Sequence, residues 1–444
     1  MKMKLGVLIA LIIFIIVLIG IIIIVPTLII INNKKVKTEI KNEVANENVI
    51  ENNVNNNENN NNDDVNKRRA DLNFDFLKLE NNSKNLIYSP LSIKYALKML
   101  NEGAQGNTKE QIETVLNNVN LTKYKNIEKV LSLANCIYIR DNYAEFINEN
   151  YKNTLKNKYD AEINYDEFKN STNVNNWIEN KTLGIIKNML DDDMFNDKDL
   201  KMLIINALAI DMEWEEKFSE DNTRGREFTL ENGNEVIATT MNKKASSDNI
   251  KYYIDDKVTT LTMNLKKYDD TQLEFMAIMP NNEKLSDFVK DISKEKIDDI
   301  YKEQKTAAST NAGLNIFVPK FSYEYDLQFE QDLKALGIRD AFDPNLANFL
   351  KMTNSEDERL YVGKALHKAN IDFTEKGVKA AAVTVFAMLK ATAMIQEEKP
   401  IEVKIDKPFM YVIKDKNTNE IWFTGTVYEP NLWENDKDDY TVRF

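Results

Sequence analysis

Thr-Glu-Lys-Gly-Val-Lys-Ala-Ala-Ala-Val-Thr, at residues 374–384, is the most informative stretch of this chain. It opens with polar residues, and Gly377 then provides a backbone pivot because glycine tolerates dihedral angles that other residues avoid. The residues after Gly377 are mostly small or β-branched, and no proline follows until Pro400. Such a run can enter a β-sheet without overpacking it.

A strand built from this run has two different faces. Alternation with a period of two places Val378, Ala380, Ala382 and Thr384 on one face, which is small and mostly apolar, as a buried face requires. The opposite face carries Lys379, Ala381 and Val383, and its charge suits exposure to solvent. The pattern predicts a loop that is able to become a strand. An alanine-rich helix is the alternative, because helix propensity favours the run AAAVTVFAMLKATAM.

The rest of the chain mixes helical and strand-like patterns without a regular alternation between them. This irregular order predicts an α+β fold rather than a doubly wound one. The expected helices are 91–100, 109–116, 174–190 and 328–336, and the expected strands are 137–140, 203–211, 273–279, 314–318 and 409–413.

The segments on both sides of residues 374–384 resemble those that bracket the reactive-centre loop of serpins. They are LYVGKALHKANIDF before it, and IEVKIDKPFMYVIKDKNTNEIWFTGTV after it. Four further stretches resemble serpin segments in the family's order: NLIYSPLSIKYALKMLNEGAQGNTKEQIETVL, VNNWIENKTLGIIKNML, LIINALAIDMEWEEKF and NIFVPKFSYEYDLQFEQDLKALGIRDAF. From about Arg69 to Pro430, the chain is identified as a member of the serpin family, of the inhibitory type.

The resemblance implies the serpin fold, with a large mixed β-sheet A, further sheets, surrounding helices and an exposed reactive-centre loop. It also implies an irreversible suicide-substrate inhibitor of a serine protease, or of a cysteine protease. Such an inhibitor traps the acyl-enzyme when its cleaved loop inserts into sheet A. The alternative is a non-inhibitory serpin that acts as a carrier, chaperone or storage protein. The hinge residues that the resemblance implies are Glu375, Gly377, Val378, Ala380, Ala381, Ala382 and Thr384.

Two further groups of site residues follow from the resemblance. Ser89, Ser92, Asn206 and His367 match the shutter network of serpins, in which the imidazole hydrogen-bonds the central-strand asparagine. Such a network suits a buried site, because buried polar groups need hydrogen-bond partners. Trp214 matches the tryptophan of the breach, the region where sheet A first opens.

The position of the reactive bond stays open between two alternatives. Counting from Gly377 as the family does places it at Ala391-Thr392, which predicts an elastase-like target protease. One residue earlier, Lys390-Ala391 predicts a trypsin-like target, whose acidic pocket pairs with lysine. The loop is several residues longer than in many relatives, so Met388, Leu389 and sites further on also remain candidates.

One departure from the family limits what can be transferred. Residues 117–130 are too few for the longer helix and strand that serpins usually carry there. Some family members bind heparin on that helix, so no glycosaminoglycan site is expected here.

The N-terminus is organised differently from the remainder of the chain. Residues 5–31 are almost wholly apolar, and lysines flank them. A spanning helix needs about 20 residues and a secretory signal about 7–15 apolar ones, so this segment suits an uncleaved signal-anchor or an unusually long signal peptide. The prediction is therefore a chain of the secretory pathway that is extracellular, either secreted or tethered to a membrane through residues 5–31.

The remaining domain boundaries follow from composition. Residues 32–66 are rich in Asn, Glu and Asp and are expected to form a disordered linker. The serpin domain is predicted at 67–430, and residues 431–444 form an acidic C-terminal tail.

Composition argues against several other functions. The chain has a single histidine and a single cysteine, and no G-x-S-x-G, glycine-rich phosphate loop or H-E-x-x-H motif occurs in it. Catalysis, a metal site and a cofactor are therefore not expected. A net charge of −13 disfavours nucleic acid as a partner. Cys136 is predicted to be a buried small hydrophobe, and the protein is expected to be a monomer.

Overall fold

A computed structural model describes residues 70–378 and 399–434. The helices in this part are α2 (Asp75–Leu79), α3 (Pro90–Gly103), α4 (Gly106–Leu116), α5 (Glu149–Tyr159), α6 (Thr172–Lys181), α7 (Leu285–Lys290), α8 (Lys294–Glu303) and α9 (Phe329–Ala335). The strands are β1 (Leu86–Tyr88), β2 (Leu131–Arg140), β3 (Glu162–Asp166), β4 (Met202–Ile210), β5 (Met212–Glu213), β6 (Arg224–Thr229), β7 (Glu235–Ala245), β8 (Ile250–Ile254), β9 (Val258–Asn264), β10 (Leu273–Pro280), β11 (Lys305–Thr306), β12 (Leu314–Pro319), β13 (Phe321–Asp326), β14 (Lys368–Phe373), β15 (Gly377–Val378), β16 (Ile401–Lys404), β17 (Phe409–Asp415) and β18 (Ile421–Val427).

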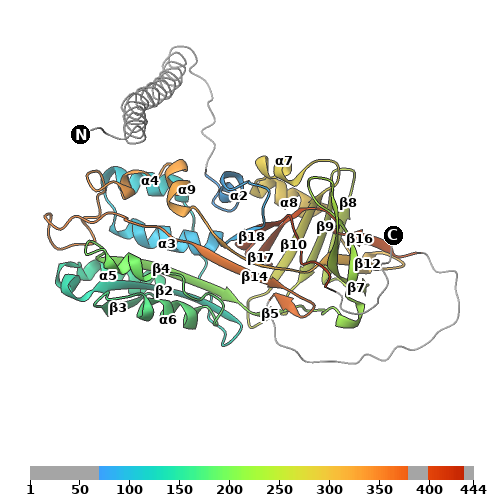
Figure 1. Cartoon of the computed structure of the whole chain (residues 1–444), viewed down its shortest axis with the longest axis horizontal. Helices are drawn as coiled ribbons and strands as arrows, with labels where there is room; N and C mark the ends of the chain where they lie inside the picture. Colours follow the sequence, from blue (N-terminus) through green and yellow to red (C-terminus); the bar gives the residue numbers. More distant parts are fainter. Residues whose placement is uncertain (1–69, 379–398, 435–444) are drawn as a thin grey trace, which may run out of the picture. The chain divides into compact units, whose positions relative to one another are not determined.

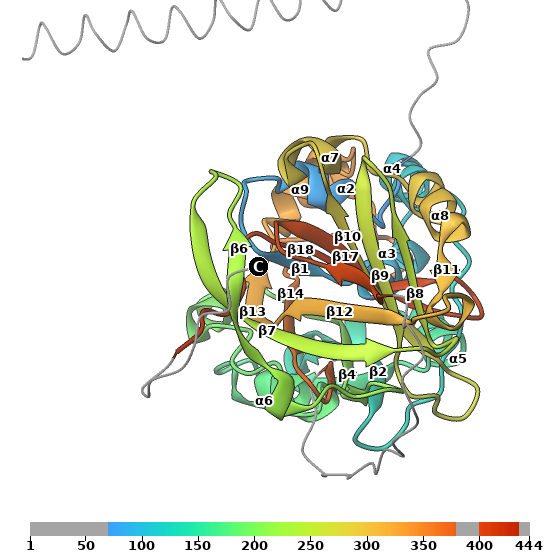
Figure 2. The ribbon, with the colours of Figure 1, turned by 90° about the vertical axis from the view of Figure 1, so that its right-hand side faces the viewer.

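The strands form several sheets. The largest has the order β1-β18-β17-β10-β9-β8-β11, and a second has the order β16-β12-β7-β6. In Figure 2, β7 and β12 cross the strands of the largest sheet at a steep angle, and β16 contacts β9 between the two sheets. Packing of this kind buries the inner faces of both sheets. The α+β class expected from the sequence is confirmed.

Two further sheets carry the candidate site. Their orders are β3-β2-β4 and β13-β14-β15-β5. They are joined by one chain segment, since β4 and β5 are separated only by Asp211. Helix α3 packs against β4 from one side, and α6 contacts β4 and β2 from the other, as Figure 1 shows.

Helix α3 begins at a well-formed N-terminus. The hydroxyl oxygen of Ser89 accepts a hydrogen bond of 3.0 Å from the backbone N–H of Ser92, and Pro90 occupies the first helical position. A serine cap satisfies one of the free N–H groups at a helix start, and proline fits there because that position needs no N–H donor. The same two serines face the candidate site described below.

The expected helix at 174–190 is only partly correct, because α6 ends at Lys181. The Thr182 hydroxyl donates to the Ile178 carbonyl and accepts the Ile186 N–H at 3.1 Å, so Ile186 bonds a side chain instead of the Thr182 carbonyl that a continuing helix would use. Leu183 and Gly184 then adopt positive φ angles of 56° and 75°. A residue in the left-handed region ends a helix, and glycine adopts it without strain.

The core below the two smaller sheets is rich in aromatic rings. The ring of Phe373 stacks on Phe321 with 4.5 Å between ring centroids and meets the edge of Trp214 at 5.2 Å. All three side chains are buried, so their packing stabilises this region.

Cys136 is buried in the structure, as predicted from the sequence.

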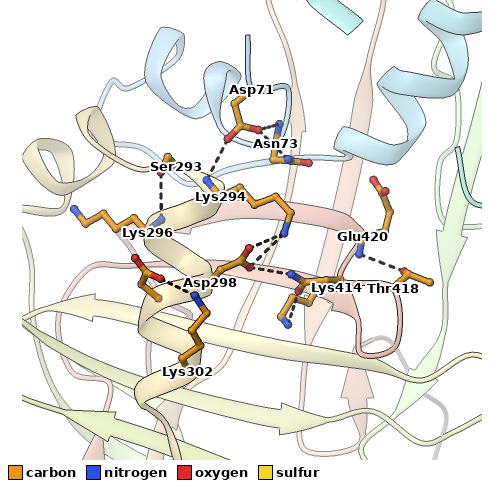
Figure 3. A network of polar contacts seen from close by, with 12 residues as sticks. Asp71, Asn73, Ser293, Lys294, Lys296, Asp298, Lys302, Lys414, Thr418 and Glu420 are labelled. Carbon is orange, nitrogen blue, oxygen red and sulfur yellow. Dashed lines mark hydrogen bonds and ion pairs between the residues drawn. The ribbon is translucent and has the colours of Figure 1, made fainter. Parts of the chain in front are cut away.

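A polar network ties the start of the described chain to α8 and to the turn between β17 and β18 (Figure 3). The carboxylate of Asp71 accepts the Lys294 N–H at 3.2 Å, and the Lys294 ammonium pairs with Asp298 at 3.1 Å. The side-chain amide of Asn419 then connects Asp298 to Lys414. Its N–H donates to Asp298 at 2.9 Å, and its oxygen accepts from Lys414 at 2.8 Å. This network fixes three separate segments to one another.

Two statements about helices can be made for the described part of the chain. Residues 117–130 hold no helix. Across residues 70–378 and 399–434, none of the helices combines the length and the apolar composition needed to cross a membrane. The predicted anchor at 5–31, the predicted linker at 32–66 and positions 435–444 of the predicted tail lie outside the described residues.

Candidate functional site

A cleft separates β4 from β14. Neither strand pairs with the other anywhere in the described chain, so one edge of each faces the cleft. The unfilled space between them, including the part open to solvent, is about 790 Å³. Its lining includes Ser92, Asn206 and Ala209 on one side, and His367, Ala369 and Ile371 on the other.

Two of the predicted hinge residues, Gly377 and Val378, form a short strand at one end of this cleft. In β15, Val378 pairs with Phe373 of β14 and with Met212 of β5, and Gly377 pairs with Glu213. The start of residues 374–384 therefore joins the sheet as a strand between its two neighbours. Val378 is buried and lines the cleft, which agrees with the face predicted for it.

Gly377 is required here by close contact rather than by its backbone angles. A Cβ atom at this position would come within 2.1 Å of the Met212 carbonyl oxygen and 2.7 Å of the Glu213 Cα. Its φ angle is not in the positive region that favours glycine. In this conformation the missing side chain of Gly377 matters rather than unusual dihedral angles, and its role as a pivot stays a prediction.

Trp214 forms hydrogen bonds with the chain where the predicted hinge begins. Its indole N–H donates a hydrogen bond of 2.8 Å to the Thr374 carbonyl, and its backbone N–H donates one of 2.9 Å to the Lys376 carbonyl. The Phe218 N–H adds a third, of 2.9 Å, to the Glu375 carbonyl. Trp214, the tryptophan predicted for the breach, therefore bonds Thr374 and Lys376, on either side of Glu375, the first of the predicted hinge residues.

The Glu375 carboxylate is fixed by two neighbours that the sequence analysis did not identify. The Thr223 hydroxyl donates to it at 2.7 Å, and the Lys320 ammonium pairs with it at 2.9 Å. Burial alone would raise the pKa of Glu375, but these hydrogen bonds outweigh burial and hold the pKa below its usual value. A lysine at the junction between β12 and β13 is the only signal in the sequence that could have suggested this pair.

Asn206 connects the cleft to the interior of its sheet. Its side-chain oxygen accepts a hydrogen bond from the Ser92 hydroxyl, and its amide donates one of 2.7 Å to Asn135. Asn135 in turn donates 2.8 Å to the Tyr159 carbonyl. Asn135 was not predicted, although an asparagine within the apolar run of β2, in register with Asn206, signals a buried polar pair.

His367 joins this chain of hydrogen bonds through Ser89 and not through Asn206. Its Nε2 atom accepts a hydrogen bond of 3.1 Å from the backbone N–H of Ser89. Burial of the ring lowers the pKa of the imidazole to about 4, so the ring is neutral at pH 7.

The implied bond between His367 and Asn206 is absent from the described part of the chain, and that detail is corrected. The two residues lie on opposite walls of the cleft, where β4 and β14 are not paired with each other. The four predicted residues are nevertheless brought to one place by consecutive hydrogen bonds, from His367 to Ser89, from Ser89 to Ser92 and from Ser92 to Asn206.

Several predicted site residues cannot be placed. Ala380, Ala381, Ala382 and Thr384 of the hinge lie outside the described residues. So do both alternatives for the reactive bond, at 390–391 and 391–392.

Comparison with known proteins adds independent findings. The model of the family described as "Serpin (serine protease inhibitor)" matches residues 68–430. An uncharacterized serpin-like protein of Methanosarcina acetivorans is 29% identical over 377 residues, covering 80% of this chain and 84% of that protein. Neuroserpin of Homo sapiens is 25% identical over 405 residues, covering 84% of this chain and 93% of neuroserpin.

Solved structures resemble the described fold. The thermophilic serpin tengpin in its native state has a TM-score of 0.68 and 28% identity, covering 83% of this chain and 95% of tengpin. Tengpin in its latent state has a TM-score of 0.64 and 27% identity, covering 84% of this chain and all of that chain.

Proposed function

This chain belongs to the serpin family, and from that premise we propose that it is an irreversible suicide-substrate inhibitor of a serine protease, or of a cysteine protease. It has the serpin fold, in which the sheets β3-β2-β4 and β13-β14-β15-β5 correspond to the two halves of sheet A. Serpins as a family inhibit proteases rather than catalyse reactions.

The observation that carries the proposal is the position of β15 at the end of the cleft. Val378 pairs with β14 on one side and with β5, which follows β4 in the chain, on the other, and residue 379 continues the chain from that point. Below Val378, the facing edges of β4 and β14 have no strand partner in the described chain. A new strand that continued β15 would supply both edges with hydrogen bonds and would bury its small face.

The chemical step belongs to the target protease. Its serine hydroxyl attacks the carbonyl carbon of the reactive bond, the C–N bond breaks, and the new amino terminus leaves with the proton. The carbonyl carbon is then held as an ester on the protease. Cleavage frees residues 379 onward to enter the cleft, and the esterified protease is carried with them. Serpin loop insertion is itself a known example of strain released by proteolysis.

Stored free energy is what drives such an insertion. The uncleaved state leaves two strand edges without partners, and the inserted state pairs them, so the uncleaved state must be kinetically trapped. The bonds from Trp214 and Phe218, and the Glu375–Lys320 pair, hold the hinge at the entrance until cleavage.

The same proposal assigns the partner and the compartment. The target is an elastase-like or a trypsin-like serine protease, depending on the reactive bond. The apolar residues 5–31 support a secretory route, with the domain extracellular and either secreted or tethered to a membrane.

Two measurements test the inhibitory function. The full-length protein is incubated with serine and cysteine proteases, and a covalent band of summed mass on a denaturing gel is the expected result. Clean cleavage of the loop should also raise the melting temperature by tens of degrees, because the inserted state is the more stable one. Cleavage without a covalent band and with an unchanged melting temperature would favour a non-inhibitory carrier, chaperone or storage protein.

A further inference from the structure

Four asparagines of the sequence begin an Asn-x-Ser/Thr triplet, and the structure describes all of them. They are Asn81, Asn120, Asn170 and Asn180. Such a triplet is the acceptor of N-linked glycans, which are bulky, hydrophilic and confined to protein surfaces. A folded chain accepts a glycan where the asparagine amide nitrogen and the hydroxyl two residues later both reach the transferring enzyme. The four triplets differ in the exposure of these two groups.

Asn170 presents both groups to solvent. It lies in the turn between β3 and α6, and the side chains of Asn170 and Thr172 are both exposed. The Asn170 side-chain oxygen accepts the backbone N–H of Thr172 at 3.0 Å, a turn that asparagine commonly forms. This bond holds the amide oxygen against the backbone. In the described part of the chain, the Asn170 amide nitrogen and the Thr172 hydroxyl form no hydrogen bond, so both are free to react or to be recognised.

The residues around Asn170 hold it in this position. On one side, the Phe168 side chain is buried, and the Phe168 N–H donates to the Asp166 carboxylate at 2.6 Å. On the other side, Ser171 donates to the Asp192 carboxylate from its backbone N–H at 2.9 Å and from its hydroxyl at 2.6 Å. The turn is anchored on both sides of Asn170, so the fold itself presents this acceptor and no unfolding is needed.

Two of the other triplets have a required group that is occupied in the fold. Asn81 is half-buried, and its amide nitrogen donates to the Ser286 carbonyl at 2.7 Å, so a glycan on this nitrogen would displace that bond. Asn180 is exposed on α6, but Thr182 of the same triplet is fully buried. Its hydroxyl donates to the Ile178 carbonyl at 2.8 Å and does not reach the surface.

The triplet at Asn120 is intermediate between these cases. Asn120 is exposed, but Leu121 packs against the core, and Thr122 is half-buried. The Thr122 carbonyl also accepts a hydrogen bond of 3.1 Å from the Tyr95 hydroxyl, which fixes the backbone at this point. Its threonine is therefore less accessible than Thr172.

A hollow beside Asn170 has room for the first sugars of a glycan. Tyr165, Asn170 and Thr172 line it, and its unfilled space, including the part open to solvent, is about 820 Å³. The Tyr165 side chain is 50% exposed, and the remaining lining residues are polar or charged. An exposed aromatic ring packs against the apolar face of a sugar ring, and amides and carboxylates hydrogen-bond sugar hydroxyls.

We propose that Asn170 is the acceptor of an N-linked glycan, and that it is the triplet which the folded chain offers to a transferase. The donor is a lipid-linked oligosaccharide. The Asn170 amide nitrogen gives a proton to the transferase and attacks the anomeric carbon of the first sugar. The bond from that carbon to the phosphate oxygen of the lipid carrier breaks, and the carrier leaves with the electron pair. Occupancy in cells rests on the secretory route of the proposed function, whereas the acceptor property does not.

Transfer to the purified protein tests the acceptor directly. Full-length protein from a host without N-glycosylation is incubated with a single-subunit oligosaccharyltransferase and a lipid-linked oligosaccharide, and peptide mass spectrometry gives the occupancy of each asparagine. We expect several-fold higher occupancy at Asn170 than at Asn81, Asn120 or Asn180. Short peptides carrying the four triplets should be modified at comparable rates, because they lack the fold. Equal occupancy of the four asparagines in the folded protein, or none at Asn170, would overturn the proposal.

Two variants control this experiment. Asn170→Gln removes the acceptor and should abolish the main product. Asn234→Thr creates a triplet at Asn232, in the exposed turn between β6 and β7, where the Asn232 side-chain oxygen accepts the N–H of residue 234 at 2.9 Å. This is the same local bond as at Asn170. Modification of Asn232 in this variant without modification of Asn170 would show an active enzyme and a wrong assignment.

Protein recovered from cells that perform N-glycosylation separates the acceptor from the rest of the proposed function. A glycan on Asn170 is expected there. If Asn170, and Asn232 of the Asn234→Thr variant, stay bare in cells but are modified in the purified protein, the secretory route is refuted and the acceptor stands. Asn170→Gln should trap protease as the wild type does, because Asn170 lies outside the cleft and the hinge. Absence of trapping by both proteins, with Asn170 modified in the wild type, would refute the inhibitory function alone.

Discussion

Gly377 lies so close to Met212 that a Cβ atom on the glycine would come within 2.1 Å of the Met212 carbonyl oxygen. The strand β15 can therefore occupy its place between β14 and β5 only with a glycine at this position. Backbone contact therefore fixes the position of β15. Trp214 and Lys320 bond Thr374 and Glu375, which precede it in the chain.

Gly377→Ala should displace β15 from the sheet. The clash is with backbone atoms, which cannot move aside as a flexible side chain can, so the cost should be about 1–3 kcal/mol of native stability. We expect a lower melting temperature. We also expect more inhibitor molecules to be cleaved as simple substrates for each molecule that traps a protease. Gly363→Ala is the matched control, since its nearest atom would be 4.0 Å away. Identical behaviour of the two variants would show that β15 does not form in solution.

Ala382→Arg should abolish inhibition but leave the loop cleavable, because the arginine would have to be buried unpaired in the sheet. Ala380→Pro should act similarly, since proline removes a donor from the strand ladder. Ala381→Arg is the control, because alternation places it on the solvent face. The measurement is the yield of covalent complex per molecule of protease. Trapping at wild-type yield by Ala382→Arg or Ala380→Pro means that the insertion face is misassigned.

His367→Gln should change the pH dependence of stability. The folded-state pKa of His367 is about 4, below its ordinary 6.5, so its stabilising contribution is complete above about pH 6.5 and is lost as pH falls through about 4. Glutamine keeps an acceptor for the Ser89 N–H but cannot be protonated. The variant should therefore gain melting temperature relative to the wild type as pH falls over this window. A difference that does not vary with pH would contradict a buried neutral imidazole.

These results show what local sequence can and cannot predict here. Alternation of small residues predicted the buried position of Val378, because side-chain period and size are local properties. The partners of Glu375 could not be found in this way, since Thr223 and Lys320 are brought to it by tertiary contacts. The end of α6 was missed because the side chain of Thr182 competes for backbone bonds. The resemblance placed His367 at the cleft but gave it the wrong partner.

Trp433→Ala should destabilise the junction between β12 and β13. The Trp433 N–H donates to the Ile237 carbonyl at 2.9 Å, and the Asn431 N–H donates to the Lys320 carbonyl at 2.9 Å, so these C-terminal residues extend the sheet beside the Glu375 ion pair. The indole packs against Gly225, where a Cβ would meet it at 2.7 Å. The indole is only half-buried, so its loss should lower stability by about 0.5–3 kcal/mol, measured as the melting temperature. Leu432→Ser, at a side chain that is 59% exposed, should have little effect.

The reactive bond can be assigned by exchanging two adjacent residues outside the described part of the chain. Lys390 and Ala391 require different protease pockets. Lys390 needs a buried negative charge, and Ala391 needs a small apolar pocket. Specificity is a difference of affinities, so one substitution should separate the two alternatives. If Lys390-Ala391 is the bond, Lys390→Ala should remove nearly all inhibition of a trypsin-like protease, because the acid of its pocket is left unpaired.

If Ala391-Thr392 is the bond, Lys390→Ala should spare inhibition of an elastase-like protease, and Ala391→Arg should convert the target to a trypsin-like one. The two substitutions serve as controls for each other, because they change adjacent residues of the same loop. Mass spectrometry of the released C-terminal fragment gives the answer directly. A fragment that begins at Ala391 or at Thr392 selects one bond, and a fragment that begins elsewhere refutes both, because the acyl group must lie on the residue before the new amino terminus.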